Sequence, residues 1–556
     1  MADVRWWRGA VIYQIYPRSF LDTNGDGVGD LPGIIEQLDY VASLGVDAIW
    51  VAPFFKSPMA DFGYDIADYR AVDPLFGTLD DFDHLVRKAH ALGLKVMIDQ
   101  VPSHTSLEHA WFRESRESRG NPRADWYVWA DPREDGTAPN NWLSIFGGPA
   151  WQWEPRRQQY YLHNFLAEQP DLNFHNPEVR AAVLDAMTFW LDRGVDGLRL
   201  DAINFCYHDR TLRNNPPKPL SKRTGRGFSP DNPYAHQYHI YNNTQPENLT
   251  FLEELRALLD RYPGAAALGE ISSEDSLATI AEYTRDRRLH MGYSFELLAD
   301  DFSAAYIRDT VRRLEAKMEG GWPCWAISNH DVERVLSRWG GGRPAAALAN
   351  LLTAMLCSLR GAVCVYQGEE LGLTEAEVPY EALRDPYGIA FWPQFKGRDG
   401  CRTPMPWSAN DHAGFTTGNP WLPVPKEHLA LAVTRQEMDP ASTLHGFRTF
   451  MRWRQAHPAL RTGGIRFLHT PEPVLAFTRH TDEEVLLVAF NLSAEAAELT
   501  LPLTGTAQTL RGHGLREGML DGDRLQLPSY GAVFALLENA DRSQHVFNAT
   551  NTGAAP

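Results

Sequence analysis

Eight short apolar runs, rich in β-branched residues, occur between residue 11 and residue 366. Longer segments separate them, and in most of these the apolar residues recur with the period of a helix. Strands that alternate with helices form parallel sheets, because each helix returns the chain to the same edge. Eight such units predict a (β/α)8 TIM barrel. The expected strands are Val11–Tyr16, Val46–Ala52, Leu94–Val101, Gly197–Asp201, Ala266–Ile271, Met291–Glu296, Cys324–Ser328 and Ala362–Tyr366.

Seven segments are expected to be barrel helices, and one of them has a clear start. In Asn176-Pro177-Glu178 a capping residue precedes a proline and an early acid, which is typical of a helix N-terminus. The expected helices are Leu31–Leu44, Leu79–Leu92, Glu178–Arg193, Leu252–Tyr262, Phe302–Glu319, Arg343–Leu359 and Leu444–His457.

Changes in composition divide the chain into four parts. The barrel is expected to begin with residues 1–104 and to continue over 176–462. Residues 105–175 are rich in Trp, Pro, Gly and Asn, which predicts a small inserted domain after the third strand. A second loop-rich insertion covers about 374–424. Alternating apolar and polar residues over 463–540 predict a C-terminal antiparallel β-domain.

The charge balance limits the partners of this chain. Its formal net charge is -18 at pH 7, whereas nucleic acids and anionic membranes attract basic faces. We expect neither as a partner. No apolar stretch approaches the length of a membrane span, and the first residues do not resemble a signal peptide. These features favour a cytoplasmic protein.

The five cysteines are Cys206, Cys324, Cys357, Cys364 and Cys401. They are odd in number and widely spaced, and no two form a C-x-x-C pair. We therefore expect buried free thiols rather than disulfides or a zinc site.

Polar residues cluster where the expected strands end. Asp99 to His104 end the third strand, Asp201 the fourth, Glu270 the fifth and Asp331 the seventh. In barrel enzymes the catalytic groups lie at these carboxyl ends, where the loops meet over one face. Any single acid could instead cap the next helix. Four caps at four strand ends are a weaker explanation than a common site.

Several carboxyl groups at one barrel mouth favour glycoside hydrolysis, which needs one ionised and one protonated carboxyl at the same pH. Arg199 precedes Asp201 by two residues, so both side chains should lie on the same side of the strand. A neighbouring guanidinium would favour the ionised form of Asp201, as a nucleophile requires.

An ordered series of motifs resembles the α-amylase superfamily, glycoside hydrolase family 13, and most closely its oligosaccharide-specific α-glucosidases. The matching segments are GVDAIWVAPFFKSPMADFGYDIADY, DQVPSHT, QPDLNF, DGLRLDAINF, LGEI, AISNHDVER, GAVCVYQGEELG and GRDGCRTPMPW. The resemblance implies that Asp201 is the nucleophile, Glu270 the general acid/base and Asp331 the transition-state stabiliser.

The resemblance also implies a substrate pocket around the terminal glucose. In this pocket Asp65 and Arg402 would close the end behind the sugar and so restrict the enzyme to chain ends. Ser103 departs from the family, which commonly has asparagine there. The implied substrate-binding residues are Asp65, Tyr64, His104, Phe165, Arg199, His330 and Arg402.

The implied activity is that of a retaining, exo-acting α-glucosidase on short oligosaccharides, with transglucosylation to hydroxyl acceptors. Ala202 follows the nucleophile where relatives that prefer α-1,6 bonds usually carry valine, which favours α-1,4 bonds. The long loop Phe205–Asn248 is expected to overhang the acceptor side. Sucrose- or trehalose-acting relatives use the same three acids, and this alternative stays open.

A glycine-rich loop is the one candidate metal site. Its oxygen-bearing residues alternate as hard cations require, and related α-glucosidases bind calcium or magnesium in this loop. Position twelve is Gly33 rather than glutamate, which argues against an EF-hand. A structural Ca²⁺ or Mg²⁺ would be held by Asp22, Asn24, Asp26, Val28 and Asp30.

Two other classes of protein are weaker alternatives. Non-catalytic relatives typically lose the catalytic acids and carry a membrane helix, whereas this chain keeps all three acids. A metal-dependent barrel hydrolase could use His104, His163 or His330 as ligands, but the sequence has no H-x-H pair.

Overall fold

The computed structural model describes residues 5–223, 231–341, 345–503 and 506–538. Eight parallel strands form one sheet in the order β11-β10-β9-β5-β2-β1-β13-β12. A parallel bridge between Gly292 and Pro323 joins the two outer strands, so the sheet closes and the predicted TIM barrel is confirmed. The strands are β1 (Val11–Ile15), β2 (Ala48–Val51), β5 (Lys95–Gln100), β9 (Gly197–Leu200), β10 (Ala266–Glu270), β11 (Met291–Tyr293), β12 (Cys324–Ala326) and β13 (Ala362–Tyr366).

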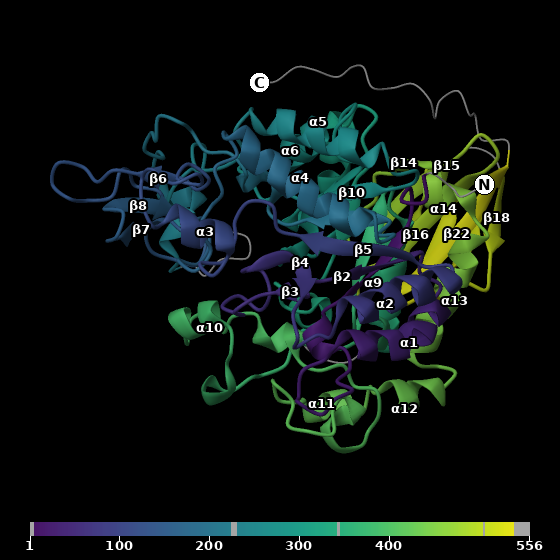
Figure 1. The fold of residues 1–556 in the computed structure, drawn as a ribbon. Coiled ribbons are helices and arrows are strands. Elements are labelled where there is room, and N and C mark those ends of the chain that lie inside the picture. Colours follow the sequence, from purple (N-terminus) through teal and green to yellow (C-terminus); the bar gives the residue numbers. More distant parts are fainter. Residues whose placement is uncertain (1–4, 224–230, 342–344, 504–505, 539–556) are drawn as a thin grey trace, which may run out of the picture.

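Helices surround this barrel (Figure 1). Their starts follow local chemistry: Asn176 accepts a hydrogen bond from the Glu178 amide, and Thr78 forms a capping box with Asp81. One helix, α6, was not predicted. The expected helix Arg343–Leu359 corresponds to α9, and its first residue, Arg343, lies outside the described residues. The helices are α1 (Leu31–Ser43), α2 (Leu79–Ala91), α4 (Pro177–Leu191), α5 (Asn248–Leu259), α6 (Ser276–Tyr283), α7 (Ala304–Lys317), α9 (Ala346–Ser358) and α13 (Thr443–Gln455).

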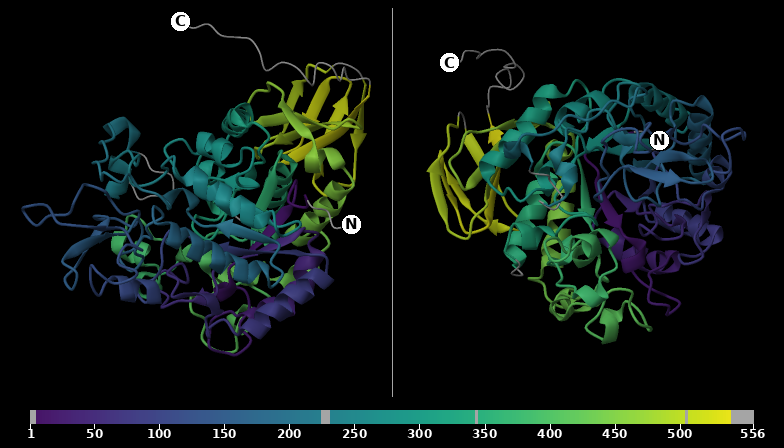
Figure 2. Two further views of the ribbon diagram at one scale, coloured as in Figure 1. Left: turned by 45° about the horizontal axis from the view of Figure 1, so that its top comes forward. Right: turned by 90° about the vertical axis from the view of Figure 1, so that its left-hand side faces the viewer.

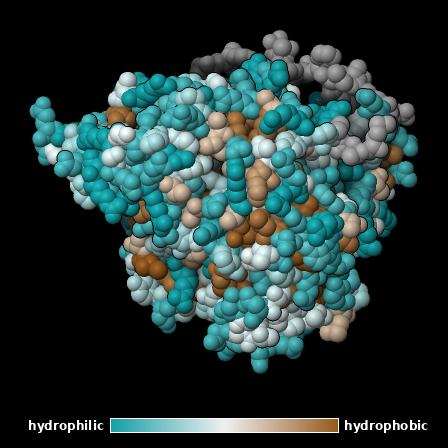
Figure 3. Space-filling model, viewed as in Figure 1, coloured by the Kyte–Doolittle hydropathy of each residue, from teal (hydrophilic) through white to brown (hydrophobic). Residues whose placement is uncertain are grey.

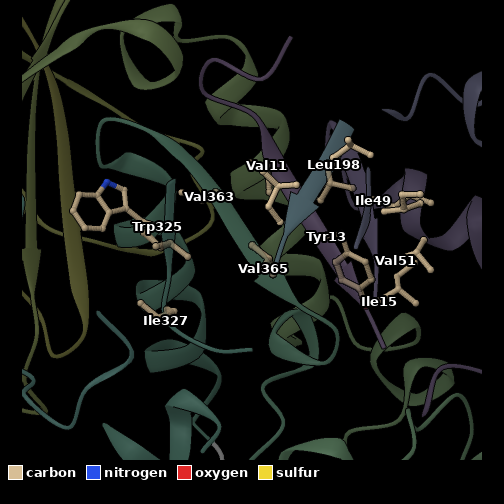
Figure 4. Close-up of a cluster of buried hydrophobic side chains, with 14 of the residues drawn as sticks. Val11, Tyr13, Ile15, Ile49, Val51, Leu198, Trp325, Ile327, Val363 and Val365 are labelled. Carbon is tan, nitrogen blue, oxygen red and sulfur yellow. The ribbon is translucent and has the colours of Figure 1, made fainter. Parts of the chain in front are cut away.

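The barrel strands alternate between two hydrophobic clusters. Val11, Tyr13 and Ile49 belong to the cluster that includes the helices, and Figure 4 shows them among other residues of that layer. Ile12 and Trp50 belong to a second cluster, in which the strands contribute alternate residues that fill the barrel. The side chain of each strand residue therefore points either to the helices or to the interior.

The sixth strand is shorter than predicted. It ends at Tyr293, and a 3₁₀-helix follows over Phe295–Leu298. Ser294 caps this helix by accepting a hydrogen bond from the Glu296 amide. The strand was predicted to continue to Glu296 because its residues are mostly apolar, but Ser294 begins a helix there instead.

Two segments extend the carboxyl end of the barrel. The first holds α3 (Ala110–Ser115) and a sheet of order β6-β8-β7, and it projects at the left of Figure 1. The second, after β13, carries α10 (Pro386–Phe391). Further short elements are β3 (Phe55–Lys56), β4 (Asp68–Val72), β6 (Trp129–Ala130), β7 (Trp151–Glu154), β8 (Gln159–Leu162), α8 (Val335–Arg338), α11 (Lys426–Leu429), α12 (Val433–Glu437) and α14 (Pro458–Thr462).

The C-terminal part is an antiparallel β-domain, as predicted, and Figure 2 shows it at one side of the barrel. One sheet has the order β14-β15-β16-β22-β18, with β19 paired to β22, and another has the order β17-β21-β20. The strands are β14 (Gly464–Phe467), β15 (Val474–His480), β16 (Val485–Asn491), β17 (Ala497–Thr500), β18 (Thr506–Leu510), β19 (Arg516–Glu517), β20 (Met519–Asp521), β21 (Arg524–Leu527) and β22 (Gly531–Glu538).

Two further predictions concern exposure. All five cysteines are buried free thiols, as expected. Within the described ranges, no helix combines the length and the apolar character needed to span a bilayer. Figure 3 shows that hydrophilic residues cover most of one face of the molecule, with small apolar patches between them.

Candidate active site

A cavity of about 130 Å³ opens at the carboxyl ends of the barrel strands. Acids from three strand ends line it together with many aromatic rings. Its lining residues are Asp61, Tyr64, His104, Ile145, Phe146, Phe165, Gln169, Asp201, Ala202, Phe205, Glu270, Ser272, Phe295, Asp331, Val332, Tyr387, Phe395 and Arg398. The cavity thus contains the three predicted catalytic acids.

Arg199 organises the acids at the bottom of this cavity. On β9, Leu198 and Leu200 face the helices, so Arg199 points inward and Asp201 follows on the same side, as predicted. Nη1 of Arg199 lies 2.6 Å from Oδ1 of Asp201, and Nη2 lies 2.6 Å from Oε1 of Glu270. One guanidinium group therefore holds both carboxyl groups side by side.

Further contacts fix this arrangement. Nη1 of Arg199 also lies 2.8 Å from Asp99, which accepts a hydrogen bond from the Trp50 indole. The Tyr293 hydroxyl donates to Oε1 of Glu270 over 2.7 Å. Asp99 is the second-to-last residue of β5; the sequence placed it at a strand end but gave it no role, and the structure shows that it is a third carboxylate in contact with Arg199.

Burial and charge set the protonation of the two central acids. Burial raises the pKa of Asp201 to about 7, against the opposing effect of Arg199. Burial also raises the pKa of Glu270 to about 7, again opposed by Arg199. Because the two groups lie on one guanidinium, their titrations are coupled. Near neutral pH the pair can hold one proton, which is the state that an ionised nucleophile and a protonated acid require.

Asp331 is in the opposite electrostatic situation. Burial alone would raise its pKa, but His330, Arg398 and Arg402 hold the pKa of Asp331 well below its usual range. Nη2 of Arg402 lies 2.8 Å from Oδ1 of Asp331, and Nη1 of Arg398 lies 3.2 Å from the same oxygen. Asp331 is therefore an ionised hydrogen-bond acceptor in the wall of the cavity.

His330 supports Tyr64 instead of lining the cavity. Its Nε2 lies 2.6 Å from the Tyr64 hydroxyl and its Nδ1 lies 2.7 Å from the Gln14 amide. The two rings stack with centroids 5.4 Å apart. His330 is not among the residues that line the cavity, so the structure places it behind Tyr64, and its contact with the sugar stays a prediction.

His104 lines the cavity, as predicted, and Ser103 orients it. The Ser103 hydroxyl lies 3.0 Å from Nδ1 of His104, while Gln169 lies 3.2 Å from Nε2. Burial lowers the pKa of His104 to about 4, so the imidazole is neutral. The departure from the family asparagine therefore leaves His104 with an orienting partner.

The prediction for Asp65 is wrong. The Asp65 side chain is fully buried and accepts hydrogen bonds from Ser57 and from the backbone amides of Ala60 and Asp61. It stabilises its own loop and does not line the cavity. Asp61 does line it, and the Gln169 amide donates to Asp61 over 3.3 Å.

The prediction for Arg402 is also wrong in detail. Its guanidinium is buried, donates to the His330 carbonyl over 2.6 Å, and reaches the cavity only through Asp331. Arg398, four residues earlier, lines the cavity and lies 2.8 Å from Asp61. The acid and the arginine that line the cavity as an ion pair are therefore Asp61 and Arg398.

Aromatic and aliphatic side chains form much of the cavity lining. The predicted residue Phe165 has its ring 5.0 Å from His104 and 5.3 Å from Phe205. Tyr387 and Phe395 come from the insertion after β13, with ring centroids 4.5 Å apart. Tyr387 and Phe395 were not predicted, because no motif in the sequence distinguishes these two rings from the other aromatic residues of the chain.

The candidate metal loop is held in place by the second insertion. The Asp22 amide donates to the Phe415 carbonyl over 2.9 Å, and a Cβ on Gly27 would lie 1.8 Å from the Asn419 carbonyl oxygen. Asp22 accepts hydrogen bonds from the amides of Gly25 and Gly27, and Asp30 caps α1. Among the described residues, no three acidic, histidine or cysteine side chains gather closely enough to hold an ion in this conformation.

Comparisons with known families agree with this geometry. Residues 14–463 match the model of the α-amylase catalytic domain. Residues 465–533 match the model of the C-terminal domain of maltogenic amylases. The two matches meet at the boundary between the barrel and the antiparallel β-domain.

Individual proteins resemble the chain over almost its whole length. A probable alpha-glucosidase of Rhizobium meliloti (strain 1021) is 55% identical over 539 residues, which cover 96% of this chain and 98% of the relative. An oligo-1,6-glucosidase of Heyndrickxia coagulans is 38% identical over 540 residues, 89% of this chain and 94% of the relative. The crystal structure of the alpha-glucosyl transfer enzyme XgtA is 69% identical, with a TM-score of 0.95, and the match covers 96% of this chain and 99% of that one.

Proposed function

The chain belongs to the α-amylase family of glycoside hydrolases, and on that premise we propose that it is a retaining, exo-acting α-glucosidase that also transfers glucose to hydroxyl acceptors. The observation that best supports the proposal is that the Arg199 guanidinium forms ion pairs with both Asp201 and Glu270. It sets two carboxyl groups side by side, as a retaining mechanism requires, whereas inversion needs room for a water molecule between them.

The proposed reaction has two steps. Glu270 donates its proton to the departing oxygen while Asp201 attacks the anomeric carbon, which gives a covalent β-glucosyl enzyme. Glu270 then takes a proton from water or an alcohol, whose oxygen displaces Asp201 and releases an α-glucoside or α-glucose. Asp331, ionised and held by two arginines, is suited to accept hydrogen bonds from sugar hydroxyls as positive charge develops in the ring.

Exo action is supported by an ion pair in the cavity lining. Asp61 and Arg398 both line the pocket and form an ion pair over 2.8 Å, and we propose that this pair closes the pocket behind the terminal glucose, so that a polysaccharide cannot pass through. An endo-acting enzyme needs a cleft that is open at both ends. The substrates proposed are therefore short α-glucosides, read from the non-reducing end, with α-1,4 bonds favoured.

Transfer to hydroxyl acceptors is supported by the apolar residues in the cavity lining. Rings such as Phe295, Tyr387 and Phe395 and the side chain of Val332 line it. Apolar surface binds the hydrocarbon part of an alcohol better than it binds water. The sucrose- or trehalose-acting alternative would use the same acids with a different leaving group, so only the product profile separates the two.

We also propose a structural cation in the loop from Asp22 to Asp30. Its possible donors are all oxygen atoms, which suits Ca²⁺ or Mg²⁺, and the loop lies against residues 415–421. Asn24 and Asp26 are exposed and would have to turn toward Asp22 to bind. An ion there would brace the loop after β1 and would take no part in the reaction.

A cytoplasmic location is a further proposal. All five cysteines remain unpaired, which suits a reducing compartment, where disulfides are rare.

The test of the main proposal is a product profile. Purified enzyme is incubated separately with maltose, isomaltose, sucrose, trehalose and soluble starch, with and without an alcohol. We expect glucose from maltose, an alkyl α-glucoside when the alcohol is present, and slow release from starch. Faster cleavage of starch than of maltose would contradict exo action. Exclusive activity on sucrose or trehalose would favour the alternative.

A further inference from the structure

Asn232 lies behind the cavity wall and connects three segments that surround the mouth of the pocket. It belongs to the long loop after β9, and its side chain is fully buried. Its Nδ2 donates to the Ile145 carbonyl over 2.7 Å and to the Tyr387 hydroxyl over 3.0 Å. Ile145 belongs to the inserted segment after β5, whereas Tyr387 lies on α10 in the insertion after β13.

The amide group of Asn232 is fully used in these contacts. Both N–H groups of Nδ2 have an acceptor, and Oδ1 accepts a hydrogen bond from the Tyr234 amide over 3.0 Å. A buried amide that satisfies every polar atom favours one arrangement of its partners. A shift of either insertion would leave at least one of these buried groups unpaired, and such groups are costly.

The partners of Asn232 are themselves wall residues. Ile145 and Tyr387 line the cavity, and the Tyr387 ring packs 5.4 Å from Phe146. Figure 1 shows α10 below the inserted strands β6 to β8. Phe146 in turn lies under the Arg398 guanidinium at 5.1 Å. The contacts thus run from Asn232 through the aromatic wall to the pair that closes the pocket.

A second contact fixes the N-terminal end of the same helix. Asp385 caps α10 by accepting from the Tyr387 amide over 3.2 Å, and it also accepts from Nη2 of Arg398 over 2.9 Å. Tyr387 is therefore held at its backbone by Asp385 and at its hydroxyl by Asn232. The position of this ring is determined by groups outside the cavity.

We propose that Asn232 is a positioning residue that keeps the acceptor side of the pocket closed and so sets the partition between transfer and hydrolysis. This inference rests on the proposed function, because it assumes a covalent glucosyl enzyme. In transfer, the acceptor oxygen bonds to the anomeric carbon while the bond to Asp201 breaks, and the acceptor proton passes to Glu270. A closed apolar wall holds an alcohol in place and limits the access of water to the same carbon.

The experiment uses p-nitrophenyl α-glucoside as donor and benzyl alcohol as acceptor. Nitrophenol release measures every turnover and free glucose measures hydrolysis, so the difference measures transfer. In Asn232→Ala we expect the ratio of transfer to hydrolysis to fall at least about threefold, because the wall loses its fixed position. We also expect kcat/KM on maltotriose, relative to maltose, to rise.

Two further variants separate positioning from a loss of folding. Tyr387→Phe removes only the hydroxyl that Asn232 reaches, and the ratio should fall in the same direction even if Asn232→Ala does not fold. Gln245→Ala is the matched control, because Gln245 is a buried amide in the same loop whose Nε2 donates to the Ile240 and Asn243 carbonyls and not to a residue that lines the cavity, among the residues described. Its ratio should stay at the wild-type value.

The possible outcomes give different conclusions. An unchanged ratio in Tyr387→Phe and in a folded Asn232→Ala would overturn the role of Asn232 while leaving the glucosidase proposal intact. If the ratio of transfer to hydrolysis fell equally in Gln245→Ala, the specific role of Asn232 would also be overturned, because any disturbance of the loop would then lower the ratio. A wild-type enzyme that releases no nitrophenol would refute the proposed function and, with it, this inference.

Discussion

Arg398 forms an ion pair with Asp61 in the lining of the pocket, with Nη2 and Oδ1 2.8 Å apart. The same guanidinium reaches Asp331 through Nη1 over 3.2 Å. One cation therefore joins the group that closes the pocket to the proposed transition-state stabiliser. A sugar that displaces this ion pair would also alter the charge around Asp331.

The variant Asp61→Asn tests this relationship. Because Asp61 lines the cavity and Asp65 does not, kcat/KM on maltose should fall about 100-fold in Asp61→Asn, as when a preorganised charged contact is lost. The melting temperature should change little. A larger loss of kcat/KM in Asp65→Asn at an unchanged melting temperature would contradict this assignment.

The pH dependence should show two coupled groups near neutrality. Below the acidic limb the nucleophile Asp201 is protonated, and above the basic limb Glu270 has lost its proton, so kcat/KM should be bell-shaped with its optimum near neutral pH. The hydrogen bond from Tyr293 lowers the pKa of Glu270. Tyr293→Phe should therefore move the basic limb to higher pH. A basic limb that stays in place or moves to lower pH would contradict this account.

Ala202 is expected to influence linkage preference. Its backbone is left-handed, with φ 42° and ψ 43°, and its side chain lines the cavity beside the nucleophile. Relatives that prefer α-1,6 bonds usually carry valine at this position, so Ala202→Val should raise the ratio of kcat/KM on isomaltose to that on maltose. A β-branched residue is strained in this conformation, so the free energy of unfolding should fall by about 1 kcal/mol. Kinetics on the two disaccharides measure the first effect, and a ratio that does not rise would contradict it.

If the proposed cation is structural, its removal should lower the stability of the protein without changing the catalytic reaction. Chelation should lower the melting temperature, and Ca²⁺ or Mg²⁺ should restore it, because an ion that binds only the folded state stabilises it. Asp26→Asn should weaken this response. Loss of initial activity at an unchanged melting temperature would argue against a structural ion.

The sequence predicted the site well where the signal was local. Arg199 and Asp201 follow the two-residue period of a strand, and Glu270 ends the neighbouring strand, so their common direction follows from the fold class. The barrel was predictable for the same reason, since the alternation of apolar runs and helical segments is a local pattern.

Predictions from the sequence were wrong where the path of a loop decides which of two similar residues lines the cavity. Asp61 and Asp65 are both acids in one segment, and only the turn of the backbone makes Asp65 the acceptor for its own loop. Arg398 directly precedes a 3₁₀-helix over Asp399–Arg402, of which Arg402 is the last residue, and both arginines reach Asp331. Asn232 meets partners 87 and 155 residues away, which no local pattern reveals.

Peptide mass spectrometry of a trapped intermediate tests the central claim most directly. The Glu270→Gln enzyme is mixed with α-glucosyl fluoride, whose leaving group needs no protonation, and quenched in acid before digestion. Without its general base the glucosyl enzyme should accumulate, so the peptide that contains Asp201 should carry one added glucosyl group. An adduct on another residue, or none while fluoride is still released, would contradict a double displacement through Asp201.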